Sequence, residues 1–291
     1  MKSTVKEDVT ALLVKALEEG NAPWRKGWTG GMAPTSLASG KPYSGINTLI
    51  LSLLGEEYAH PLWLTFKQAQ ALGGSVKKGE KSVRIVYAAQ KASAPTPEGE
   101  KDKGFFFYKW FNVFNIGQCE GIEIPAKYLP TGEAVAPLDA INAIWDGYTN
   151  RPELFYSEQG RAFYSPARDS ITLPTLAQFK SAEEHAYTFA HEMIHSTGHQ
   201  SRAHRWTTEE DKNAKFGCES YAKEELIAEV GACMLLANAG VEFDIPNSAA
   251  YLRSWIKALN DDKSLIFKAS AKAQAAANYI QGTKIEVEVS A

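Results

Sequence analysis

The chain has 291 residues, of which 44% are hydrophobic and 22% are charged, and its formal net charge is −3. This is the composition of a globular protein, and no apolar run approaches the roughly 20 residues that a membrane helix needs, so we expect no membrane partner. The N-terminus lacks the apolar core of a signal peptide, and the three cysteines are scattered and odd in number. Both features exclude a secreted protein and predict a cytoplasmic one with reduced thiols.

Charge is divided unevenly along the chain. Residues 1–130 contain 16 Lys and Arg against 12 Asp and Glu, whereas residues 131–291 contain 15 against 22. The segment 125–137 has a proline at each end and is the expected linker. We therefore predict two domains, 1–130 and 131–291. The basic excess of the first suggests an anionic partner.

The first domain is expected to begin with a helix over roughly residues 5–19, because apolar residues recur there at helical spacing. Beyond it, aromatic residues alternate with cations. Proteins that bind single-stranded nucleic acid use this combination, since rings stack on unpaired bases while Lys and Arg contact phosphates. The candidate DNA-binding residues are Trp24, Arg25, Lys26, Trp28, Tyr43, Asn47, Trp63, Lys67, Lys77, Lys78 and Lys81. The alternative is a core role for the rings, which we expect for alternate members of the strand predicted at 105–114.

The second domain is expected to open with a helix over about residues 138–148, followed by a β-hairpin. Residues 161–166 and 169–174 are strand-like runs on either side of a turn. An edge strand there can pair with an extended peptide, although Pro166 and Pro174 can equally protect the edge from aggregation. Two further helices are expected near the C-terminus, at 251–259 and 265–280.

The stretch His191-Glu192-Met193-Ile194-His195 carries the strongest functional signal. On a helix that starts at Ser181 and ends near Gly198, residues four apart point the same way, so the two imidazoles can bind one metal ion. Glu192 follows the first of them, where its carboxylate can reach a metal-bound water as the general base. We predict two histidine ligands, Glu192 as the catalytic residue, and one divalent metal, with zinc first and manganese as the alternative.

A catalytic zinc usually has three protein ligands, and the best source of the third is the run Lys223–Glu229. Glu225 and Glu229 lie one turn apart on one face of a predicted helix. The run resembles the gluzincin-like pattern of many metallopeptidases. That resemblance implies Glu225 as the ligand and Glu229 as the residue that orients a ligating histidine; the reverse order stays open. Tyr221, one turn before Glu225, is a candidate for stabilising an oxyanion.

His199 supports a different interpretation. His191, His195 and His199 are spaced four apart, and Gly198 stands where the metzincin pattern HExxHxxGxxH has its glycine. That pattern requires a histidine at position 201, where this chain has Ser201. We therefore expect His199 in a loop beside the site, with direct metal ligation as the alternative.

Taken together, these motifs resemble those of the plasmid antirestriction proteins of the ArdC type. The resemblance rests on residues 24–28, 42–47, 63–69, 73–81, 111–115, 191–199, 201–202 and 221–229. It implies an α+β fold in which a single-stranded-DNA-binding domain, shared with some plasmid primases, precedes a zincin-like metallopeptidase domain. It also implies a protein that protects incoming plasmid DNA from host restriction and is either encoded by the plasmid or transferred with it to the recipient cell.

Three functions remain open at this point. The chain can coat and protect single-stranded DNA, act as a DNA-directed metalloprotease on restriction or repair proteins, or bind host restriction enzymes directly with a structural metal. Steep salt dependence of DNA affinity separates the first two from the third, because phosphate contacts weaken as salt rises. Protection that survives Glu192→Gln would speak against the second.

Overall fold

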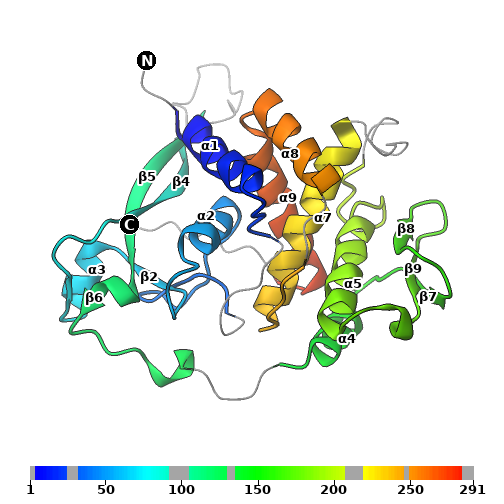
Figure 1. Ribbon diagram of the computed structural model, residues 1–291, viewed down its shortest axis with the longest axis horizontal. Coiled ribbons are helices and arrows are strands. Elements are labelled where there is room, and N and C mark those ends of the chain that lie inside the picture. Colours follow the sequence, from blue (N-terminus) through cyan, green and yellow to red (C-terminus); the bar gives the residue numbers. More distant parts are fainter. Residues whose placement is uncertain are drawn as a thin grey trace, which may run out of the picture.

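The computed structural model describes residues 4–24, 32–91, 105–129, 135–206, 219–245 and 249–283 (Figure 1). The helices of the N-terminal half are α1 (Val5–Glu18), α2 (Ile46–Leu54) and α3 (Phe66–Ala71). Those of the C-terminal half are α4 (Pro137–Gly147), α5 (Ala182–Ser196), α7 (Glu219–Asn238), α8 (Ala249–Asp261) and α9 (Leu265–Ile280). Separate sheets accompany the two sets of helices, so the fold class is α+β, as predicted.

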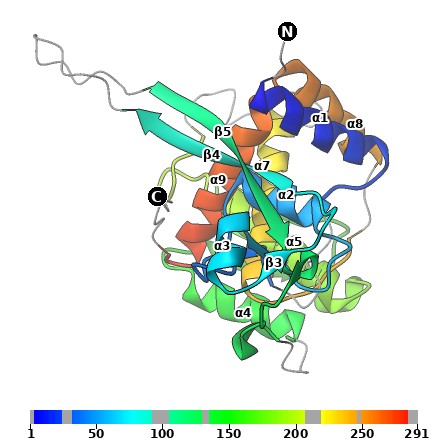
Figure 2. The same cartoon turned by 90° about the vertical axis from the view of Figure 1, so that its left-hand side faces the viewer.

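The N-terminal half is built on a four-stranded sheet in the order β1-β2-β5-β4. Its strands are β1 (Thr35–Ser36), β2 (Leu62–Leu64), β4 (Val83–Lys91) and β5 (Phe105–Asn115). The antiparallel pair β4 and β5 forms the long ribbon that projects from the molecule (Figure 2), and β5 confirms the strand predicted at 105–114. A separate two-stranded sheet joins β3 (Ser75–Val76) to β6 (Cys119–Glu120).

The C-terminal sheet has the order β7-β9-β8. Its strands are β7 (Glu153–Ser157), β8 (Phe163–Ser165) and β9 (Ser170–Pro174). The antiparallel pair β8 and β9 is the predicted hairpin, and β7 runs parallel to β9. Helix α5 lies between this sheet and α7 (Figure 1), so β8 is a sheet edge against the helix that carries the HExxH stretch.

Helix α5 begins where the sequence predicts. The Ser181 side chain accepts a hydrogen bond from the Glu184 backbone N–H, which satisfies one of the free donors of the first turn. Its apolar stripe packs against α7, where a glycine allows close approach: a Cβ on Gly231 would lie 2.7 Å from Cδ1 of Ile194. This close packing brings α7 near enough to place a side chain against the α5 histidines.

The core runs across both halves of the chain. Helix α1 packs on α8, and the fully buried rings of Trp24 and Trp255 meet edge to face with centroids 5.3 Å apart. One cluster of buried residues therefore includes α1, α2 and the C-terminal helices. The domain boundary near residue 130 stays a prediction, because residues 130–134 lie outside the described ranges. In the described part of the chain, every helix is too short or too polar to cross a membrane.

Candidate functional site

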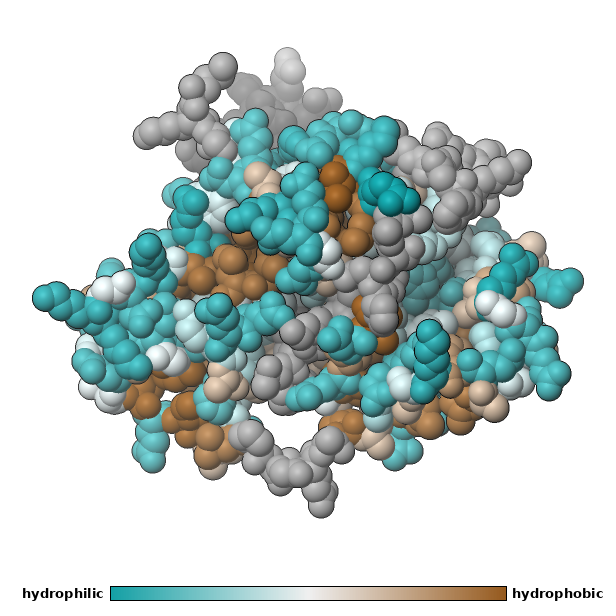
Figure 3. Space-filling view, in the orientation of Figure 1, coloured by the Kyte–Doolittle hydropathy of each residue, from teal (hydrophilic) through white to brown (hydrophobic). Residues whose placement is uncertain are grey.

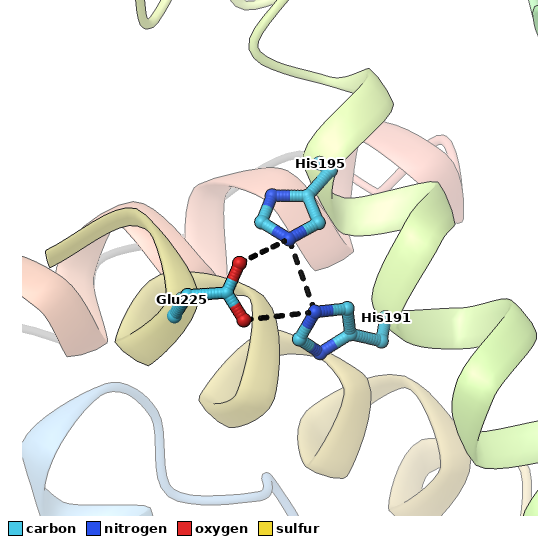
Figure 4. Close-up of side chains that lie close together, drawn as sticks. All are labelled: His191, His195 and Glu225. Carbon is cyan, nitrogen blue, oxygen red and sulfur yellow. Dashed lines mark hydrogen bonds and ion pairs between the residues drawn. The ribbon is translucent and has the colours of Figure 1, made fainter. Parts of the chain in front are cut away.

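Three side chains from two helices converge at one point (Figure 4). Helix α5 supplies His191 and His195, and α7 supplies Glu225. The Nε2 atoms of the two histidines are 3.0 Å apart. The Glu225 carboxylate lies 3.5 Å from Nε2 of His191 and 3.3 Å from Nε2 of His195. The structure thus brings together the three residues that the sequence predicts as metal ligands.

The spacing of these donor atoms suits a small divalent cation. Around a tetrahedral ion with bonds of about 2.0–2.1 Å, neighbouring donors lie about 3.3–3.4 Å apart, close to the separations of 3.0 to 3.5 Å found here. Two imidazoles and one carboxylate also leave one position of a tetrahedron for a water or a substrate oxygen. The donor set fits a divalent metal in both chemistry and geometry.

The other ring nitrogen of His195 has a carboxylate partner. Nδ1 of His195 lies 3.1 Å from Oε1 of Glu224. Arg205 holds Glu224 in turn, with Nε 3.0 Å from Oε2 and a second nitrogen 2.5 Å from Oε1. Such a partner fixes which ring nitrogen faces the metal. Sequence reasoning missed Glu224, although it directly precedes the predicted ligand in the same Glu-Glu pair.

His191 faces Glu229 on its outer side. Nδ1 of His191 lies 3.7 Å from Oε1 of Glu229, and the Tyr187 hydroxyl donates to Oε2 of Glu229 at 2.7 Å. Glu229 therefore lies outside the donor cluster and Glu225 within it. Of the two orders that the sequence left open, the geometry favours Glu225 as the ligand.

The partners around the cluster shift its pKa values. Burial by itself raises the pKa of Glu225, but hydrogen bonds from His191 and His195 outweigh it and hold that pKa far below 4.5. Burial by itself lowers the pKa of His195, but Glu224 and Glu225 raise it well above 6.5. Burial also opposes ionisation of Glu224, yet Arg205 and His195 lower its pKa to about 2. Without a metal, the two α7 carboxylates therefore stay ionised and the two α5 imidazoles favour their protonated forms.

Glu192 lies on the same helix but has a different environment. Its side chain is buried, with the residue 7% exposed, and burial raises its pKa above 4.5 although the neighbouring histidines pull it down. A hydrogen bond from the Tyr164 backbone, on the edge strand β8, stabilises the carboxylate. A carboxylate with a raised pKa beside a metal site is suited to take a proton and return it.

Two tyrosine hydroxyls lie beside the third ligand. The Tyr221 and Tyr251 hydroxyl oxygens are 3.4 Å apart. Burial, reinforced by the charge of Glu225, raises the pKa of Tyr221 far above 10, and its hydroxyl hydrogen-bonds to that carboxylate. Tyr221 is therefore protonated and able to donate, as its candidate role requires. Sequence reasoning missed Tyr251 because it comes from a different helix, α8.

His199 lies outside the cluster. Helix α5 ends at Ser196, and Nδ1 of His199 is 2.8 Å from Oγ of Ser201 and 3.9 Å from Oδ2 of Asp169. The ring is thus held in the loop after the helix, as expected, and the alternative of direct ligation has no support in the geometry.

Three of the candidate DNA-binding residues have structural roles instead. Trp24 and Trp63 are 0% exposed, so neither ring can stack on a base, and the prediction for these two is wrong. Asn47 uses both ends of its amide on Val86: Nδ2 donates to the carbonyl oxygen and Oδ1 accepts from the N–H, each at 2.8 Å. It joins α2 to β4. Alternation of rings and charges along the sequence did not reveal which rings are buried.

The exposed candidates lie around the N-terminal sheets, where the space-filling view shows hydrophilic surface broken by apolar patches (Figure 3). Tyr43 is half-buried. The exposed lysines of the prediction are Lys67, Lys77, Lys78 and Lys81. Arg25, Lys26 and Trp28 lie outside the described residues. Sequence reasoning missed one ring pair at the surface: the half-buried Tyr87 of β4 and the exposed Phe111 of β5 meet edge to face with centroids 5.3 Å apart, and Phe111 is 42% exposed.

Two family models match the chain. Residues 3–114 match the N-terminal domain of the anti-restriction factor ArdC, and residues 150–272 match a zincin-like metallopeptidase. The fold is similar to the crystal structure of the metal-free antirestriction ArdC protein from the R388 plasmid, with 36% identity, a TM-score of 0.75 and coverage of 95% of this chain and 96% of that one. The chain belongs to the ArdC antirestriction family. The Mn(II)-bound structure of the same relative matches with a TM-score of 0.74.

Curated relatives extend this family into longer proteins. Two Escherichia coli proteins named DNA primase TraC are 36% and 35% identical over 96% of this chain. The chain spans 27% and 20% of their lengths, so it corresponds to only part of each primase. An uncharacterized protein, y4eC, from Sinorhizobium fredii (strain NBRC 101917 / NGR234) is 29% identical over 97% of this chain and 93% of its own length.

Proposed function

We propose that this ArdC-family chain binds single-stranded DNA and protects incoming plasmid DNA from host restriction, with a metal-dependent peptidase-like centre in its C-terminal half. The observation that carries this proposal is the combination, in one chain, of an ArdC-type N-terminal domain and a partly buried cluster of two histidines and a glutamate. The relative from the R388 plasmid is itself named an antirestriction protein. We assign the activity to the cytoplasm, including that of a recipient cell that receives the protein with plasmid DNA.

Zinc is the metal that we propose for the cluster, with manganese as the alternative. Imidazole and carboxylate donors at tetrahedral spacing favour zinc, whereas the ArdC relative has been crystallised with Mn(II). When bound by His191, His195 and Glu225, either ion would supply Lewis acidity, which activates a water molecule and polarises a carbonyl group.

The residues around the cluster support peptide hydrolysis. An extended substrate pairs with the edge of β8, which lies against α5. Glu192 accepts a proton from the attacking water and delivers it to the amine leaving group. Tyr221 turns its one hydroxyl proton, which faces Glu225 in this structure, to the oxygen on which negative charge develops. Glu224 and Glu229 hold the two imidazoles in orientation.

The N-terminal sheet offers a surface for the DNA strand. The exposed Phe111 ring and its partner Tyr87 provide a face on which a base can stack. Lys109 lies on the same strand as Phe111 and is exposed, and Lys78 and Lys81 precede β4. Rings and cations gathered in this way suit unpaired bases and their phosphates.

Fluorescence anisotropy with labelled single-stranded and double-stranded oligonucleotides at two salt concentrations tests this proposal. The full chain is used, because α1 packs on α8 and an isolated N-terminal fragment would lose that contact. We expect salt-sensitive binding of single strands, weakened about tenfold by Phe111→Ala, since one stacked base contributes about 1–3 kcal/mol. The control is Phe155→Ala, which removes a ring that is 50% exposed on β7. If Phe111→Ala and Phe155→Ala bind single strands with equal affinity, the surface around Phe111 is not the DNA-binding site.

A second function, a DNA-directed metalloprotease, is favoured by one observation: Glu192 is in place beside the donor cluster. Host restriction or repair proteins are then its substrates, brought within reach by the bound strand. The third possibility from the sequence, direct inhibition of restriction enzymes, predicts protection by a chain that binds no DNA. Plasmid protection assays with DNA-binding and Glu192 variants separate these functions.

A further inference from the structure

A pocket lies where the N-terminal half of the chain meets the C-terminal helices. Its volume is about 490 Å³, inside the range of about 300–1,000 Å³ typical of small-molecule sites. One wall comes from the segment that leads into α2, and the other from α7 and α9; α2 itself packs on α9 (Figure 1). We call it the junction pocket, and define it by Tyr43, Ser44, Asn238, Gln274, Asn278 and Gln281.

The described lining of the junction pocket carries no formal charge and is rich in carboxamides. Hydrogen bonds hold these groups in place. Oε1 of Gln274 accepts from the Gly45 N–H at 3.1 Å, and Nε2 of Gln274 donates to Oδ1 of Asn278 at 2.9 Å. Nδ2 of Asn238 donates to Oε1 of Gln281 at 3.1 Å. These bonds tie α2 to α9 and α7 to the end of α9.

The same bonds use only one end of several amides. Within the described part of the chain, Nδ2 of Asn278, Oδ1 of Asn238 and Nε2 of Gln281 have no hydrogen-bond partner. The pocket therefore offers fixed donors and an acceptor at its rim, and the half-buried Tyr43, which also packs on the cluster around Trp63, is part of its lining.

This lining matches the chemistry of a nucleobase. Asn and Gln side chains pair with the donor and acceptor edges of bases, and the described lining holds four of them, Asn238, Gln274, Asn278 and Gln281. A phosphate would instead need Lys or Arg, which the described lining does not contain. Resting on the proposed binding of single-stranded DNA, we propose that the junction pocket holds one unpaired base of the bound strand.

A base in this position contacts both halves of the protein. Asn238 is the last residue of α7, the helix that also carries Glu225. Binding of the base fastens the segment before α2 to the helix of the metal cluster, and a ligand that bridges two parts stabilises their packed arrangement. The bound strand then contacts α7 in the peptidase-like half in addition to the N-terminal sheet.

Methionine methyl NMR tests the pocket directly. The chain has four methionines; Met234 lines the pocket, and Met193 lies buried in α5 beside the histidines and serves as a reference. Signals of the 13C-methyl-labelled full chain are assigned with Met→Leu variants. Titration with thymidine or deoxyadenosine should shift the Met234 signal saturably, whereas deoxyribose should leave it in place. If neither nucleoside shifts the Met234 signal of the wild-type chain, the proposal is wrong, and no pocket variant is needed to show this.

Anisotropy with a labelled oligothymidylate then separates the pocket from the proposed function. The double variant Asn278→Ala with Gln281→Ala should weaken binding about tenfold and abolish the Met234 shift. Asn142→Ala, an exposed amide on α4 outside the pocket, should change neither. Undiminished binding by the double variant, without a nucleoside shift in the wild type, would refute the pocket and leave DNA binding standing. A nucleoside shift in a wild-type chain that binds no oligonucleotide would refute DNA binding instead.

Discussion

His195 and Glu224 form a partly buried pair that fixes one imidazole of the cluster: Nδ1 of the histidine is 3.1 Å from Oε1 of the glutamate. Arg205 holds the far side of the same carboxylate. A ring whose Nδ1 is tied in this way presents Nε2 to the cluster, in the tautomer and orientation that a metal ligand needs. The contacts from Arg205 through Glu224 to His195 thus orient this imidazole for binding a cation.

Glu224→Gln should therefore weaken metal binding by about 10–100-fold, the usual cost of losing a partner outside the coordination sphere. The measurement is competition of zinc or manganese with a fluorescent chelator at pH 7. Glu183→Gln, near the start of the same α5 helix that carries the histidines, is the matched control and should bind metal as the wild type does. Unchanged affinity in the Glu224 variant would show that the contact between His195 and Glu224 does not orient the metal ligand.

Glu192→Gln should abolish hydrolysis while metal and DNA binding persist. The amide keeps the size of the side chain but cannot accept the proton of the attacking water, so the rate should fall by a factor of at least about 10²–10⁴. Hydrolysis is followed on candidate restriction or repair proteins in the presence of single-stranded DNA. Cleavage at the wild-type rate would rule out Glu192 as the base. Full plasmid protection by this variant would rule out proteolysis as the protective activity.

The C-terminal half was the easier one to predict from sequence. Helix α5 could be predicted because its signals depend only on residues close in sequence. These signals are the cap at Ser181, the apolar stripe and the spacing of His191 and His195. Glu225 could be found because its run also has helical spacing. Glu224 was missed, since two adjacent glutamates differ only in which side of α7 they face once Arg205 and α5 are packed around it.

The N-terminal half was harder, because exposure of a ring depends on tertiary packing. Trp24 is buried by Trp255, which lies at the opposite end of the sequence, and Trp63 by its contact with Tyr58 and the buried cluster around it. No sequence pattern near Trp24 predicts that its ring packs against Trp255. Phe111 shows the reverse case: it is part of a strongly apolar run, yet it lies on the exposed face of β5.

The metal-free protein should lose stability as pH rises above neutrality. The folded pKa values of His191 and His195 are raised above 6.5 by their carboxylate partners despite burial. Their contribution is thus complete below pH 6.5 and is lost as pH rises through the raised values. The pKa of Glu225 is lowered, so its contribution is present above pH 4.5 and is lost only in acid. Metal binding needs neutral imidazoles and should replace the lost stability at high pH.

Thermal unfolding between pH 6 and 9, with chelator or with added zinc, measures this effect. The Tm of the chelated protein should fall across the range, and the increase in Tm caused by zinc should grow with pH. A double His191→Ala and His195→Ala variant should show a smaller dependence of Tm on pH and little response to zinc. A chelated wild type whose Tm stays flat from pH 6.5 to 9 would mean that the histidines are neutral in the metal-free fold.

Trp24→Ala should destabilise the protein without weakening its hold on DNA. The ring is fully buried against Trp255, and truncating a core aromatic residue costs about 3–5 kcal/mol of unfolding free energy. Urea unfolding gives the stability, and anisotropy well below the midpoint gives the DNA affinity of the folded chain. Phe66→Ala, on the exposed start of α3, is the control that should leave stability nearly unchanged. If Trp24→Ala instead kept its stability and lost DNA affinity, a purely structural role for Trp24 would be wrong. The buried ring would then have to leave the core in order to stack on a base.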